Sequence, residues 1–84
     1  MSDYGRQVSA AVARSFALRR QVLGLSLEAL AQSTGLHRTS IGLIERGKRG
    51  VTLESAAAIA RALDLSLADV VAVAEQETGG VNRQ

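Results

Sequence analysis

Apolar side chains recur at the three- and four-residue spacing of an α-helix along most of this chain, and no stretch alternates with the period of a strand. Small polar residues and glycines interrupt this pattern and mark the helix ends. The pattern predicts five helices: one from Val8 to Leu23, one from after Ser26 to before Gly35, one from near His37 to Gly47, one after Thr52 and one opening at Ser66.

Alanine and leucine dominate the chain and proline is absent, which also favours helix throughout. Helices joined by such short connections predict a compact all-α domain over residues 8–75. We expect residues 1–7 to form a flexible N-terminal arm and residues 76–84 to form a flexible C-terminal tail.

The segment from residue 26 to residue 47, SLEALAQSTGLHRTSIGLIERG, combines two short helices with a tight turn. Ala31 is small enough for the helices to meet at a steep angle, and Gly35 tolerates the positive φ that the turn needs. A helix braced in this way fits the major groove of DNA, which it enters with its first turns. The outward-facing residues of this helix, most of which lie in its first turns, are His37, Arg38, Thr39, Gly42 and Leu43.

Charge is divided unevenly along the chain, although the formal net charge is only +2. Residues 1–50 hold eight Lys and Arg side chains against three acids, a net charge of +5, whereas residues 51–84 carry −3. The basic half contains the two-helix segment. This division suits a polyanion on one side of the domain and a protein partner on the other.

Several classes of site are excluded or disfavoured by the composition. The chain has no cysteine, so disulfides and thiolate metal sites are excluded, and its single histidine, His37, lacks a partner at metal-ligand spacing. No paired carboxylates, Cys–His pair or phosphate-binding glycine loop is present, so we expect no catalytic residue, no cofactor, no small-molecule ligand and no enzyme activity. Without an apolar run of membrane length or a signal peptide, we expect a cytoplasmic protein without a membrane partner.

The stretch GLSLEALAQSTGLHRTSIGLIERGKR, followed by TLESAAAIARALDLSLADVV, resembles the lambda-repressor-like helix-turn-helix family of phage repressors and Cro proteins. The resemblance covers residues 12–74 and implies a five-helix DNA-binding domain whose helix-turn-helix is formed by the second and third helices. The narrower stretch LHRTSIGLIERGKRGVTL also resembles the controller proteins of restriction–modification systems, in which a similar basic turn takes the place of the commoner proline.

The resemblance implies a role for each matching position. Arg38 and Thr39 fall where family members contact base edges, His37 lies just ahead of them, and Gly42 and Leu43 match further groove-facing positions. An arginine can bond guanine through O6 and N7 together, which is the commonest specific contact in the major groove. The side chains implied to contact phosphates are Arg46, Lys48 and Arg49.

The chain departs from the family pattern at two positions. Leu27 stands where members often carry a glutamine that touches phosphate, so we expect Leu27 to pack on the DNA backbone or on a neighbour. Gly42 stands in mid-helix where serine is common, at a cost of about 1 kcal/mol relative to alanine.

Family members also pair an arginine late in the first helix with the glutamate of the I-E-x-G motif, which implies a structural ion pair between Arg20 and Glu45.

One module of this size buries too little surface for tight specific binding, so we expect a homodimer on a near-palindromic operator. The candidate dimer interface lies on the fifth helix and contains Leu67, Val70, Val71 and Val73. We therefore predict a sequence-specific regulator of transcription that binds double-stranded DNA. A restriction–modification controller is one candidate, repression and activation are both open, and RNA polymerase is a candidate partner.

An antitoxin or a protein-binding adaptor built on the same fold is the alternative. An antitoxin usually needs a toxin-binding segment, and an adaptor does not need a polar, basic helix tip. Salt dependence discriminates between these functions, because binding to DNA weakens steeply with salt whereas binding through a valine-rich face hardly changes.

Overall fold

Polar caps begin four of the five helices at the places where the sequence pattern predicted helix starts. Backbone N–H groups of the first turns donate to the side chains of Ser26 (3.0 Å), His37 (3.1 Å), Thr52 (3.0 Å) and Ser66 (3.3 Å). These bonds satisfy N–H groups that have no partner within the helix. The starts of these four helices are therefore fixed by hydrogen bonds between residues that are close in the sequence.

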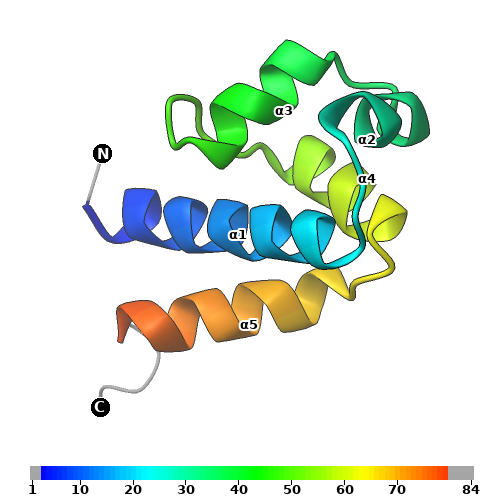
Figure 1. Cartoon of the computed structure of the whole chain (residues 1–84). Helices are drawn as coiled ribbons and strands as arrows, with labels where there is room; N and C mark the ends of the chain where they lie inside the picture. The colour runs from blue at the N-terminus through cyan, green and yellow to red at the C-terminus, as the bar shows by residue number, and fades with distance from the viewer. Residues whose placement is uncertain (1–2, 80–84) are drawn as a thin grey trace.

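The computed structural model describes residues 3–79. Within that range the chain forms five helices and no strand, which confirms the predicted all-α class. The helices are α1 (Asp3–Val22), α2 (Leu27–Thr34), α3 (Arg38–Glu45), α4 (Leu53–Ala62) and α5 (Leu67–Thr78). Figure 1 shows α1 and α5 side by side and antiparallel, with α2, α3 and α4 gathered on the other side of α1.

The first helix is longer than predicted, because α1 begins at Asp3 and not at Val8. The negative charge of Asp3 in the first turn interacts favourably with the helix dipole. The Tyr4 hydroxyl also donates to Glu75 Oε2 on α5 at 3.2 Å. The last helix likewise continues to Thr78, beyond the predicted limit of residue 75. Residues 1–2 of the predicted arm and residues 80–84 of the predicted tail lie outside the described residues.

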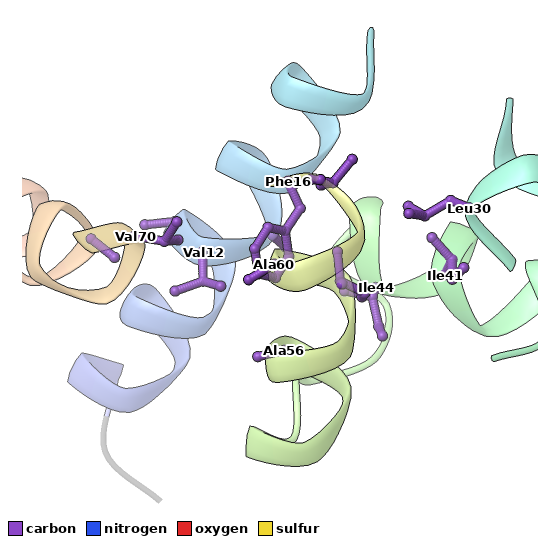
Figure 2. Packing of buried hydrophobic residues seen from close by; sticks show 13 residues of the cluster. Val12, Phe16, Leu30, Ile41, Ile44, Ala56, Ala60 and Val70 are labelled. Carbon is purple, nitrogen blue, oxygen red and sulfur yellow. The ribbon is translucent and has the colours of Figure 1, made fainter. Parts of the chain in front are cut away.

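All five helices contribute to one apolar core, which Figure 2 shows between the ribbons. Phe16 of α1, Leu30 of α2 and Ile41 of α3 are each no more than 1% exposed, so the core ties the helix-turn-helix directly to α1. Ala11 and Ala74 are fully buried and let α1 and α5 approach closely. The core thus holds α3 in place through its apolar inner face.

An ion pair at the edge of the core fixes the C-terminal end of α3. The guanidinium of Arg20 donates to both carboxylate oxygens of Glu45, at 2.7 and 2.9 Å, and to the carbonyl of Leu25 at 2.8 Å. Only 16% and 10% of the two charged side chains are exposed. The hydrogen bonds to Glu45 raise the pKa of Arg20 above its ordinary value, although desolvation acts against them.

Removal of this carboxylate by Glu45→Ala should lower the free energy of unfolding by about 3 kcal/mol, because the largely buried Arg20 charge loses its partner. Urea denaturation measures the change. Glu28→Ala is the matched control, because Glu28 pairs with Arg38 on the surface, where both side chains are more than half exposed. Equal losses in the two variants would contradict a structural role for the Arg20–Glu45 pair.

Candidate nucleic-acid interface

The turn between α2 and α3 is fixed by bonds within its own sequence. Gly35 ends α2 at a φ of 78°, and its N–H donates to the carbonyl of Ala31 at 2.9 Å. The Thr34 hydroxyl donates to the carbonyl of Leu30 at 2.8 Å and accepts from the N–H of Leu36 at 3.1 Å. The direction in which α3 leaves the turn is therefore set by three consecutive residues.

The exposed tip of α3 consists of its cap and first two residues. His37 accepts from the Thr39 N–H through Nδ1, and both side chains are exposed. Arg38 is also exposed, and its Nη1 lies 3.3 Å from Glu28 Oε2 of α2. A pair this exposed is weak, so Arg38 can exchange Glu28 for another acceptor at little cost.

The middle of the same face of α3 is less exposed than its sequence predicted. Gly42 is buried, because the Arg46 side chain and Leu27 cover it: a Cβ at Gly42 would lie 3.3 Å from Arg46 Nη1 and 3.8 Å from Leu27 Cδ1. Leu43 is half-buried. The absence of a side chain at Gly42 therefore lets the Arg46 guanidinium lie across α3.

A basic loop follows α3 directly. Arg46, Lys48 and Arg49 are all exposed, and the loop turns at Gly47, where φ is 73°. The Lys48 N–H donates to the Leu43 carbonyl at 2.8 Å, which anchors the loop to the end of α3. Three positive side chains thus follow the C-terminal end of α3, at the opposite end of the helix from its exposed tip.

Sequence reasoning missed Ser40, which holds one of these cations. Arg49 Nη1 donates to Ser40 Oγ at 3.0 Å, so the guanidinium is drawn from the loop toward α3. The two residues are nine positions apart on either side of a turn, and no helical period relates them. Only the general preference of an arginine for a nearby hydroxyl could have signalled the bond.

The predicted interface residues of α5 occupy different environments. Val70 is 7% exposed and belongs to the core of the subunit, whereas Val73 is 46% exposed. Leu67 and Val71 are half-buried and pack against the core. Of these four side chains, Val73 therefore offers the largest exposed fraction to another chain.

Other kinds of site are not evident in residues 3–79. This range contains no cluster of three His, Cys, Asp or Glu side chains able to hold a metal ion. None of the helices in the same range is long and apolar enough to cross a bilayer.

Comparison with curated proteins finds a relative that is named as a control protein. Control protein C.SmaI of Serratia marcescens is 48% identical over 48 residues, which make up 57% of this chain and 57% of the relative. The chain thus spans little more than half the length of that curated relative.

Solved structures of regulators are similar over a larger share of the chain. The restriction-modification controller protein C.AhdI from Aeromonas hydrophila is 31% identical with a TM-score of 0.67, covering 83% of this chain and 98% of its own. Controller C.Esp1396I, solved as a tetramer with its natural 35 base-pair operator, is 28% identical with a TM-score of 0.73, covering 84% and 93%. The clp gene regulator ClgR from Corynebacterium glutamicum is 26% identical with a TM-score of 0.76, covering 86% and 77%.

A family model described as Helix-turn-helix matches residues 17–70, from the middle of α1 to the first half of α5. The match includes the tip of α3, the basic loop and both partners of the Arg20–Glu45 pair. It confirms the predicted fold class, and it agrees with the expectation that the chain is not an enzyme. Because the matched residues make up more than half of its length, the chain belongs to the helix-turn-helix family.

Proposed function

We propose that this chain is a transcriptional regulator that binds double-stranded DNA sequence-specifically, as a dimer on a near-palindromic operator, and that it controls a restriction–modification system. The exposed tip of α3, together with the basic loop at the other end of this helix, is the observation that carries the proposal. Similarity to controller proteins, one of them solved on its operator, supports the choice of regulated system.

Arg38 is the proposed base reader. Its guanidinium stands at the first turn of α3, where it can bond guanine O6 and N7 together. Glu28 holds it at 3.3 Å in the free protein but has no favourable contact with a phosphate-rich surface, so DNA should displace this acid. Thr39 and His37 add polar contacts beside Arg38, and Leu43 contributes apolar contact further along the helix.

The loop cations are the proposed phosphate ligands. Arg46, Lys48 and Arg49 are exposed and close to the end of α3, so they can hold the backbone on one side of the groove. Leu27 packs near Gly42 and supplies apolar contact between α2 and α3. These contacts set the register of the helix without reading sequence themselves.

Two recognition helices are proposed to enter successive major grooves about 34–36 Å apart, which requires a two-fold dimer. The proposed contact surface lies on α5, where Val73 is the most exposed of the four side chains, Leu67 and Val71 are half-buried on another face of the helix, and Val70 belongs to the core. RNA polymerase is a proposed further partner of the DNA-bound dimer.

Arg38→Ala should remove about 1–3 kcal/mol of preference for the operator over random duplex, while binding to random duplex largely survives. Lys48→Ala is the matched variant, because it should weaken both duplexes alike and lower the salt slope by about one. Fluorescence anisotropy over a salt series, with an operator selected from random DNA, measures both effects. Equal loss on both duplexes in Arg38→Ala would reassign Arg38 to a phosphate.

Gly42→Ala should stabilise the fold by up to about 1 kcal/mol, because alanine favours helix and the Arg46 guanidinium that it meets can move aside. The same movement should weaken DNA binding. Gly35→Ala is the control and should destabilise the fold. Nothing lies within 4 Å of a Cβ at this position, but a residue with a side chain is strained at the positive φ of Gly35. Thermal melting and anisotropy together measure the two effects; unchanged affinity in Gly42→Ala would remove Arg46 from the interface.

Val73→Asp should raise the dimer dissociation constant at least about tenfold, because it places a charge in a contact that must exclude water. Sedimentation equilibrium at micromolar concentration measures the change, with the wild-type chain expected at twice its monomer mass. Leu53→Asp changes a more exposed apolar residue, 77% exposed on α4, and should leave the mass unchanged. A monomeric wild-type chain, with and without DNA, would contradict the two-fold arrangement.

A further inference from the structure

A pocket of about 470 Å³ opens between the N-terminal half of α1 and the loop that joins α3 to α4. In Figure 1 this loop curls toward the first turns of α1. Ala13 and Ile44 form part of the apolar floor, and Arg6, Lys48 and Arg49 belong to the lining. The pocket therefore joins a segment at the start of the chain to the proposed phosphate ligands.

Hydrogen bonds donated by two backbone N–H groups of the loop hold the walls of this pocket in place. The Val51 N–H donates to Ser9 Oγ at 3.1 Å, which fastens the loop to α1. Gly50 packs beside the same hydroxyl, which would lie 4.0 Å from a Cβ at that position. The loop end nearer α3 is anchored by the bond from Lys48 to the Leu43 carbonyl. The spacing between α1 and the loop is thus a fixed feature of the fold.

The pocket favours an anion. Its lining contains the three cations Arg6, Lys48 and Arg49 and no acidic side chain. Asp3 lies outside the lining and pairs with Arg6, but the two side chains are 71% and 76% exposed, so water screens the pair. Glycines at positions 5, 47 and 50 leave room for the oxygens of a bound group.

Arg49 connects the pocket to the face of α3. It lines the pocket and also donates to Ser40 on the recognition helix, so the two surfaces are continuous. A DNA strand held beside the tip of α3 would continue past this residue toward α1. The occupant that fits this position and this charge is a phosphate of the DNA backbone.

We propose that the pocket receives a backbone phosphate and that Arg6 is a phosphate ligand contributed by α1, an inference that rests on the proposed function. Arg6 falls in the segment expected to be a flexible arm. The start of α1 at Asp3 places it on the helix beside the loop. The first turns of α1 thereby become part of the DNA-binding surface.

Salt titration of binding to a random-sequence duplex tests this proposal without knowledge of the operator. Arg6→Ala in the full chain should lower the salt slope by about 0.9, which corresponds to about eightfold weaker binding at 0.1 M salt relative to an unchanged limit at 1 M. Asp3→Asn should strengthen binding, because it removes a negative charge near the phosphate. Arg6→Lys should retain most of the slope.

Arg61→Ala is the control, because Arg61 is exposed on α4 and lines a different pocket. It should leave the slope unchanged, and circular dichroism should show all variants folded. If Lys48→Ala lowers the slope while Arg6→Ala and Asp3→Asn leave binding unchanged, the role of Arg6 is overturned and the DNA-binding function stands. If the wild-type chain shows no salt-dependent binding to any duplex, the proposed function fails together with this inference.

Discussion

The position of the recognition helix depends on the bonds made by one guanidinium. Arg20 joins α1, the carbonyl at Leu25 that leads into α2, and the carboxylate of Glu45 at the end of α3. Because little of either charged side chain reaches water, the pair is stable only while all of these acceptors stay in place. The junction fixes the C-terminal end of α3, from which the basic loop leaves, while the turn at residues 34–36 directs the tip of the helix. A structural ion pair thus helps to decide where the proposed DNA ligands stand.

Two opposite requirements meet on α3, which is only eight residues long. Its inner face carries Ile41 and Ile44, which are nearly unexposed and lock it to the core. Its first turn keeps polar side chains in water, where they are held only by weak bonds such as the one between Arg38 and Glu28. A rigid inner face with an exchangeable outer face is what recognition of a groove requires, since the helix must not move while its side chains change partners.

Local chemistry could be predicted from the residues themselves, whereas the one long-range side-chain contact that was predicted, the Arg20–Glu45 pair, came from the family resemblance. Ser26 and Gly35 set the limits of α2 through bonds to their own neighbours, so these limits were found correctly. The start of α1 lies five residues before the predicted Val8, and the contact of Tyr4 with Glu75, 71 positions away in the chain, could not be read from the helical period. The helical period placed Gly42 on an open face, whereas the side chain of Arg46, four residues further on, covers it together with Leu27 of α2, and the period gave no sign of the Ser40–Arg49 bond. The burial of Val70 was likewise decided by packing against α1.

Amide chemical-shift mapping of the full chain during titration with duplex DNA at low salt tests most directly whether the tip of α3 binds DNA. The account predicts that the largest changes occur at residues 37–39 and in the loop at residues 46–50, with a smaller set at the first turns of α1. Changes confined to α4 and α5, with residues 37–39 unaffected at saturating duplex, would contradict it.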